Sequence, residues 1–248
     1  MSRKSILKTQ PLESSKVAVI NNKLKVKLDD LYEVEALTAN QQRFFNIYDK
    51  SNFIMLHGVS GTGKTYIALY KALKQVLSKD NYSRVVIVRS AVPTREIGHL
   101  PGDEREKCEV YEKPYMDICA ELFTKKDAYQ RLNEQHNIHF MITSFIRGIT
   151  LDHSIIIVDE CQNMTDMELN SIMTRVGENT KIIFCGDFRQ TDLYKRYDQS
   201  GLQKFMLITD MMPSAKSVEF DHEDIVRSKL VKEYIVARSC YEDMYETK

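Results

Sequence analysis

The chain alternates short apolar runs with longer amphipathic segments over most of its length. The apolar runs are of strand length: FIMLHG at 53, RVVIVRS at 84, IHFMIT at 138, SIIIVDE at 154, KIIFCGD at 181 and KSVEF at 216. Segments between them repeat apolar residues at helical spacing, as in KTYIALYKALKQVLS (64–78) and DMELNSIMTRVG (166–177). This alternation predicts an α/β fold, a parallel sheet with helices on both faces. Within it, the charged stretch 91–113 contains proline and glycine, and we expect a long functional loop there.

The first 28 residues form a basic segment, with seven lysines and arginines against a single acid, and the following stretch DDLYEVE is acidic. Two interpretations stay open. The segment is a solvated extension, or it is an arm that contacts phosphates, in which KLKVKL (23–28) forms a short edge strand with its lysines towards water. We expect a basic extension over residues 1–37 and one domain over residues 38–248 that ends in a helical tail.

The charge balance, the cysteines and the length of the apolar runs indicate where the protein functions and what it contacts. Lysine and arginine together number 35 and so do aspartate and glutamate, so the formal net charge is zero and any basic surface is local. The five cysteines are scattered without a C-x-x-C pair, which favours reduced thiols in the cytoplasm over disulfides or a zinc site. No apolar run approaches the roughly 18 residues of a membrane span, so we expect no membrane partner.

The stretch GVSGTGKT (58–65) matches the pattern G-x-x-x-x-G-K-[ST] and lies between an apolar strand and a helix. Glycines there let successive backbone N–H groups approach phosphate oxygens, which a Cβ would block. The first turn of the helix adds its unpaired N–H groups and its dipole. Lys64 brings a cation to the β- and γ-phosphates, and the Thr65 hydroxyl is placed to ligate Mg²⁺. We therefore predict that ATP binds here with Mg²⁺.

Two further strand ends carry candidate chemistry. In IIIVDECQN (155–163) an apolar strand ends in two carboxylates, at the edge where ligands sit in open α/β sheets. Asp159 would hold Mg²⁺ and Glu160 would act as general base for the attacking water. Gln190, beyond the strand at 181, would orient water or sense the γ-phosphate. The alternatives are two solvated acids in a turn and an exposed loop amide.

Several motifs in order resemble the PhoH-like ATPases, relatives of the RecA-like cores of superfamily-one helicases. They are TANQ (38–41), GVSGTGKT (58–65), GHLPGD (98–103), FIRGITL (145–151), VDECQN (158–163), TRVG (174–177), GDFRQTDL (186–193) and DIVRSKLV (224–231). The resemblance runs from about residue 38 to residue 237. It implies a single RecA-like P-loop NTPase domain, and it is compatible with a bacterial source or a bacteriophage source, with the cytoplasm as the location in either case.

The resemblance also implies roles for individual residues. Gln41 would contact the adenine edge, Asp159 and Glu160 would be the metal and base pair, and Gln190 would sense the γ-phosphate. The residues that hold the nucleotide would be Gly58, Val59, Ser60, Gly61, Thr62, Gly63, Lys64, Thr65 and Tyr66. The chain departs from the family at Ser90, His99, Val110 and RSKLV (227–231), where the family has proline, an aromatic residue, proline and RHPLV. These departures fall in loops that face nucleic acid or partners more than in the ATP site.

A helicase of this superfamily uses a second RecA-like domain to bring an arginine to the γ-phosphate. After Val231 the pattern predicts only a helical tail, so the arginine would come from the same domain or from another subunit. Arg147, Arg175 and Arg227 are candidates, although an exposed arginine in a salt bridge is the alternative for each. We expect a homo-oligomer, possibly a hexameric ring, in which Arg227 or Arg175 acts in trans.

Three function classes remain open. The first is a Mg²⁺-dependent ATPase coupled to RNA or single-stranded DNA, and the second is a small-molecule kinase built on the same loop. The third is a nucleotide-binding regulatory module with little turnover. Glu160 and Gln190 favour hydrolysis over the kinase, because a kinase must keep water from the γ-phosphate.

Overall fold

The computed structural model describes residues 25–90, 104–187 and 201–245. Within them, six parallel strands form one sheet in the order β3-β2-β4-β5-β1-β6. The strands are β1 Phe53–Gly58, β2 Arg84–Arg89, β3 Ile138–Ile142, β4 Ser154–Asp159, β5 Lys181–Gly186 and β6 Ala215–Phe220. Each apolar run of the sequence is therefore a strand, and the predicted parallel α/β sheet is confirmed.

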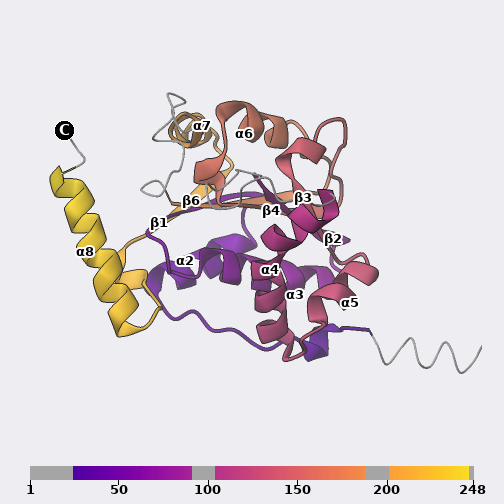
Figure 1. Cartoon of the computed structure of the whole chain (residues 1–248). Coiled ribbons are helices and arrows are strands. Elements are labelled where there is room, and N and C mark those ends of the chain that lie inside the picture. Colours follow the sequence, from indigo (N-terminus) through magenta and orange to yellow (C-terminus); the bar gives the residue numbers. More distant parts are fainter. Residues whose placement is uncertain (1–24, 91–103, 188–200, 246–248) are drawn as a thin grey trace, which may run out of the picture.

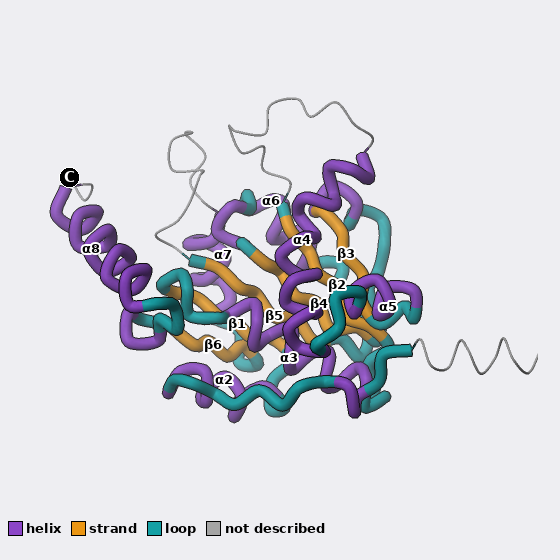
Figure 2. Tube along the Cα trace, turned by 60° about the horizontal axis from the view of Figure 1, so that its bottom comes forward, coloured by secondary structure: helices purple, strands orange, loops and turns teal. Residues whose placement is uncertain are grey.

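Helices cover both faces of the sheet (Figure 1). One face carries α2 Ala39–Tyr48, α3 Lys64–Leu77, α4 Glu104–Phe123 and α5 Ala128–Glu134, and the other carries α6 Asp166–Met173 and α7 Gly201–Asp210. Strand β4 is continuously apolar because both of its faces are buried. Ile155 and Ile157 enter the core under α2–α5, whereas Ile156 and Val158 enter the core under α6 and α7. Helix α8, Lys229–Tyr245, leads away from the sheet (Figures 1 and 2).

The loop predicted over residues 91–113 is wrong from residue 104 onward, because α4 begins at Glu104. Residues 91–103 lie outside the described part of the chain. In the described side chains of early α4, Glu109 and Val110 are exposed while Tyr115 is buried, so Glu109 lies on the solvent side of the helix. Pro114 lies inside this helix, which made a loop the natural interpretation of the sequence.

Residues 25–37, which we expected in the N-terminal extension, cross the α2–α5 side of the molecule (Figure 2). The Gln135 side chain holds the Val26 backbone, accepting from its N–H (2.6 Å) and donating to its carbonyl (3.0 Å). Further on, the Tyr32 N–H donates to the Leu122 carbonyl (2.7 Å). The expected edge strand over 23–28 is wrong in its described part, because Val26 enters the core and a 3-10 turn begins at Leu28.

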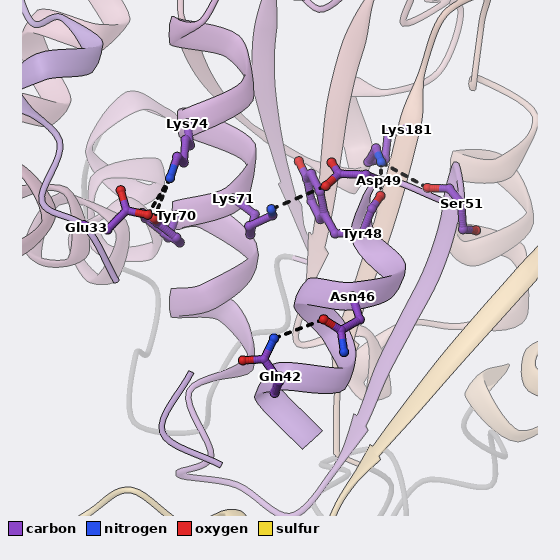
Figure 3. Close-up of polar contacts among 10 residues, drawn as sticks. All are labelled: Glu33, Gln42, Asn46, Tyr48, Asp49, Ser51, Tyr70, Lys71, Lys74 and Lys181. Atoms are coloured by element: carbon purple, nitrogen blue, oxygen red, sulfur yellow. Dashed lines mark hydrogen bonds and ion pairs between the residues drawn. The ribbon is translucent and has the colours of Figure 1, made fainter. Parts of the chain in front are cut away.

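At the amino-terminal edge of the sheet, Lys181 fixes the connection between α2 and β1 (Figure 3). Its amine donates to the carbonyls of Tyr48 and Ser51 and lies 4.2 Å from the centre of the Tyr48 ring. From α3, Lys71 approaches the same ring and pairs with Asp49 at 3.8 Å. Burial lowers the pKa of Lys181 to about 8. This cluster joins α2, α3 and β5 at one point.

The described helices and cysteines bear on two expectations, that the chain has no membrane span and that its cysteines are reduced. None of the described helices combines the length and the apolar character needed to cross a bilayer. The four cysteines whose side chains are described are free thiols: Cys119, Cys161, Cys185 and Cys240.

Candidate functional site

The segment from Gly58 to Thr65 joins the carboxyl end of β1 to the first turn of α3. Gly58, Gly61 and Gly63 have φ values of +114°, +76° and +80°, which side chains disfavour. A Cβ on Gly58 would lie 2.0 Å from the Phe220 carbonyl oxygen on β6. The Val59 N–H donates to that same oxygen at 2.9 Å, so the loop turns directly against the edge strand. The glycines therefore allow a curl of backbone that no other residue type fits.

Lys64 lies inside this curl. Its Nζ donates to the carbonyls of Gly58 (2.9 Å) and Val59 (2.7 Å). Burial lowers the pKa of Lys64, while the nearby carboxylates, Asp187 foremost, act in the opposite direction. The buried Thr62 also belongs to the curl, with its hydroxyl donating to the Val59 carbonyl (3.1 Å). The amine thus stands at the point towards which the loop backbone converges.

The Thr65 hydroxyl donates to Asp159 Oδ1 at 2.6 Å and so connects α3 to the end of β4. The other oxygen of Asp159, Oδ2, accepts from the Tyr115 hydroxyl at 2.8 Å. Asp159 and Tyr115 are both buried, which makes this carboxylate well ordered. The two residues expected to serve a metal ion are therefore adjacent, and a third residue from α4 holds the carboxylate in place.

Glu160 has a left-handed backbone (φ +52°), which is uncommon for a residue with a side chain. Its Oε2 accepts from the Gln162 amide at 2.5 Å, and Gln162 Oε1 in turn accepts from the Asp187 N–H at 3.0 Å. Burial, followed by the charge of Asp159, raises the pKa of Glu160. A carboxylate with a raised pKa is a stronger base, so the site contains a suitable proton acceptor beside Asp159.

Two distant motifs brace the phosphate loop from outside. The buried Gln41 amide accepts from the Leu37 N–H (2.8 Å) and donates to the Thr62 carbonyl (3.0 Å). Its contact with adenine stays a prediction. From the other motif, the Val226 N–H donates to the Gly61 carbonyl at 3.1 Å. The two motifs are themselves tied together, because the side chain of Asn40 donates to Asp224 Oδ2 at 2.7 Å.

The remaining loop residues differ in where they face. Ser60 is half-buried at the tip of the loop. Tyr66 directs its hydroxyl to Glu121 on α4 (3.2 Å). This leaves its backbone N–H, in the first turn of α3, as its link to the loop. Tyr66 would therefore contact a nucleotide through its backbone. The nucleotide contacts of Ser60 and Tyr66 both stay predictions.

The candidate arginines lie in three different places. Arg227 is exposed beside its own phosphate loop, with Cγ 3.0 Å from the position of a Cβ on Gly61. Arg147 follows β3 and its guanidinium contacts the Met167 sulfur at 3.6 Å. Arg175 lies at the opposite, amino-terminal edge of the sheet, where its carbonyl accepts from the Leu151 N–H. Because a strand of this length spans about 20 Å, Arg175 lies too far from the phosphate loop of its own chain to contact a nucleotide there.

Sequence reasoning overlooked Tyr115 and Gln162, and it gave no role to Arg89 at the end of β2. Arg89 is paired with Asp159 in the sheet register, and its guanidinium lies 5.6 Å from the Tyr111 ring. Tyr111 and Tyr115 are one helical turn apart, a spacing that could have indicated one shared face of α4. Gln190 lies outside the described residues, as does His99.

The oxygen atoms at this edge suit Mg²⁺ better than a transition metal. No group of three or more histidine, cysteine or acidic side chains with metal-binding geometry occurs among the described residues. Mg²⁺ is typically held by one or two carboxylates together with waters and substrate phosphates. The Thr65 hydroxyl and the Asp159 carboxylate match that kind of site.

A glycine loop between β1 and a helix, with a carboxylate on β4 and one strand between the two, defines a RecA-like P-loop NTPase domain. The fold is similar to the large terminase from a thermophilic bacteriophage, with a TM-score of 0.50 and 13% sequence identity over 85% of this chain and 51% of that chain. The class of fold expected from the sequence is confirmed.

The family model described as PhoH-like protein matches residues 33–239, and the chain belongs to this family. A PhoH-like protein of Synechocystis sp. is 33% identical over 82% of this chain and 62% of the relative. One from Bacillus subtilis is 32% identical over 82% of this chain and 63% of the relative. The chain therefore spans less than two thirds of the length of these curated relatives.

Proposed function

We propose that this chain binds ATP with Mg²⁺ at the carboxyl edge of its sheet and hydrolyses it. The observation that carries the proposal is the 2.6 Å contact between the Thr65 hydroxyl and Asp159 Oδ1. It joins the helix that follows the glycine loop to the carboxylate of a separate strand, and this brings the two metal-ligand candidates together. A structural hydrogen bond alone would not need a glycine curl and a buried lysine beside it.

The residues at this edge divide the work. Backbone N–H groups of the loop and of the first turn of α3 bind phosphate oxygens, and Lys64 supplies a cation to them. Gln41, already in contact with the loop, would also reach the adenine edge. Thr65 and Asp159 would hold Mg²⁺, which would supply positive charge to the phosphoryl oxygens. Glu160 accepts the proton of the attacking water, helped by the raised pKa of its carboxylate, with Gln190 as the sensor of the γ-phosphate.

The alternative is a regulatory module that binds nucleotide with little turnover, and a small-molecule kinase is a more distant one. The position of Glu160 favours hydrolysis, because its carboxylate is held by Gln162 next to Asp159 rather than turned into solvent. The kinase is disfavoured by the same carboxylate, since a base beside the γ-phosphate would activate water.

RNA or single-stranded nucleic acid is the partner we propose, on the strength of the basic N-terminal residues and the family resemblance. We also propose a cytoplasmic protein with a basic extension over residues 1–37 and an ATPase domain over residues 38–248 that works as a homo-oligomer, possibly a hexameric ring. Arg175 or Arg227 would act in trans on a neighbouring copy, and the position of Arg227 beside its own loop would also allow it to act within the chain.

The deciding experiment measures ATP turnover of the full chain with Mg²⁺, in the presence and absence of single-stranded RNA and DNA. Turnover that depends on Mg²⁺ and rises with nucleic acid supports the proposal, and nucleotide binding without turnover supports the regulatory module. If phosphate contacts dominate, nucleic-acid affinity falls with salt, with a log–log slope of about −0.7 for each neutralised phosphate.

Mixing inactive subunits tests the oligomer. Lys64→Ala subunits are combined with Arg175→Ala subunits, and in a second mixture with Arg227→Ala subunits. Restored hydrolysis identifies the arginine that acts in trans. If the wild-type protein is fully active as a monomer, the oligomeric site is wrong.

A further inference from the structure

Helix α8 has two different long faces. Along one face, Ser239 is buried and its neighbours are half-buried: Lys232, Ile235, Val236 and Glu242. The opposite face carries Leu230, Tyr234, Ala237, Tyr241 and Met244, all of them exposed. Leu230 is 76% exposed, Tyr234 63%, Tyr241 57% and Met244 65%. The second face is thus an apolar stripe on the outside of the molecule, and we call these five residues the α8 stripe.

The α8 stripe has the spacing of a coiled-coil seam. Its members are separated by four, three, four and three residues, which places them at alternating d and a positions of a heptad. Such spacing is favoured where two helices run side by side over their whole length. A helix that merely leans on a globular body commonly has a wider apolar face.

The part of the chain that the structure describes gives the α8 stripe no cover. The helix leads away from the sheet and makes only sparse contacts with the other described elements (Figures 1 and 2). A helix of this length is marginal in water on its own and is commonly stabilised by packing of an apolar face. The stripe is therefore the surface on which a partner would stabilise α8.

Charges beside the stripe indicate which partner fits. Glu233 lies at a g position and Arg238 lies five residues later at an e position. In a parallel, in-register pair of identical helices, g and following e′ positions face each other. Each Glu233 would then meet Arg238 of the second copy, and the two-fold symmetry would form this pair twice. An antiparallel pair would instead place g against g′ and lose both contacts.

We infer that the α8 stripe is a self-association surface, on which α8 of a second copy of this chain packs in parallel. The inference does not rest on ATP hydrolysis. It adds a contact between two copies that is separate from the ring proposed above, because a parallel, in-register helix pair has its own two-fold axis along α8. The seam spans little more than two heptads, so association through it is weak and depends on protein concentration.

The first test follows the self-association of the full chain by sedimentation velocity over a range of concentrations. Met244→Glu puts a charge in the seam and should weaken self-association about tenfold or more, because an apolar contact is lost and two like charges approach. Met167→Glu is the matched control, since Met167 on α6 is 66% exposed against 65% for Met244. A wild-type chain that stays monomeric, or an equal loss with both variants, would overturn the inference.

The second test distinguishes parallel pairing from other arrangements. Glu233→Arg and Arg238→Glu should each self-associate more weakly than wild type, because each places like charges across the seam. An equimolar mixture of the two variants should recover wild-type association, since the charges are complementary again. Circular dichroism checks that both variants keep the helix. A mixture no stronger than the separate variants would contradict parallel pairing of α8 with α8.

A third test traps the pair covalently. Ala237→Cys in a Cys240→Ser background places one cysteine in the seam, where it faces its counterpart in a parallel in-register pair. Mild oxidation should then yield a disulfide-linked dimer faster than for Lys229→Cys in the same background. Lys229 is exposed but lies off the seam. Equal rates of dimer formation for the two cysteines would also contradict the inference.

Discussion

Lys64 and Lys181 are buried lysines at opposite edges of the same sheet, and each donates to two backbone carbonyls. Their surroundings differ. The amine of Lys64 lies in a glycine curl with carboxylates close by, whereas that of Lys181 lies against the Tyr48 ring at the end of α2. In the proposed complex with ATP, phosphate oxygens would replace these carbonyls as the partners of Lys64. Lys181 instead holds the connection between α2 and β1 through the carbonyls of Tyr48 and Ser51.

Burial of a lysine does not by itself indicate function. Lys181 interacts with the carboxyl end of α2, where unpaired carbonyls and the helix dipole favour a cation. Its role is complete within the fold. Lys64 instead stands with Thr65 and Asp159 at the edge where open α/β sheets bind ligands. The partners that surround each amine, rather than its exposure, separate the two roles.

The largest effect is expected at the carboxyl edge, from Glu160→Gln. Turnover should fall about 10²–10⁴-fold, because a general base contributes roughly that much to rate, while ATP affinity is retained. Single-turnover hydrolysis and direct nucleotide binding measure the two quantities. Glu178→Gln, an exposed residue at the amino edge, is the control and should leave both unchanged. Wild-type turnover in Glu160→Gln would remove this residue from the mechanism.

A smaller effect is expected from Lys64→Ala. The loss of a charge-assisted contact with phosphate is worth about 1.5–3 kcal/mol, which is roughly 10- to 150-fold in ATP affinity. Titration with a fluorescent nucleotide checks the affinity. Thermal denaturation without nucleotide should change little, because the Val59 carbonyl keeps the Thr62 hydroxyl as a donor and Gly58 is only half-buried. Unchanged affinity and turnover would show that Lys64 does not bind the phosphates.

Lys181→Met should produce the opposite pattern. The carbonyls of Tyr48 and Ser51 lose their donor, and we expect the free energy of unfolding to fall by about 1–3 kcal/mol. Nucleotide affinity should stay at its wild-type value. Chemical denaturation and nucleotide titration of the same preparation measure both. If affinity fell as far as it does in Lys64→Ala, the separation of the two edges would be wrong.

The smallest effect concerns pH. The pKa of Lys181 is about 8 in the folded protein against an ordinary value of 10.5. Between these values the unfolded chain binds more protons, so this residue makes the free energy of unfolding rise with pH. Below pH 8 the amine is charged in both the folded and the unfolded chain, and the loss of stability caused by its burial is at its largest. Burial raises the pKa of Tyr48 and acts in the opposite direction above about pH 10, so stability is compared between pH 8 and 10. The rise should be smaller in Lys181→Met, in which only the lowered pKa of Lys64 still contributes to it, and an identical slope in both proteins would contradict this account.

The strands and the phosphate loop were predictable because their causes are local. Strands buried on both faces leave continuous apolar runs such as 154–158, and a curl around phosphate requires glycine at fixed positions. Contacts between distant segments left no such signal. Tyr115 contacts Asp159 from α4, a helix whose charged, proline-containing sequence predicted a loop. Likewise, Asn40 and Asp224 meet only because both motifs fold around the same loop.

The contact between the Gly61 carbonyl and the Val226 N–H joins the phosphate loop to the segment that leads into α8. Ile235 of α8 also lies at this junction, with Cδ1 3.4 Å from the position of a Cβ on Gly61. A helix of 17 residues is about 25 Å long. It acts as a lever, because a tilt of about 5° at its base displaces its tip by about 2 Å. A small adjustment of the loop backbone is thereby amplified at the far end of the molecule.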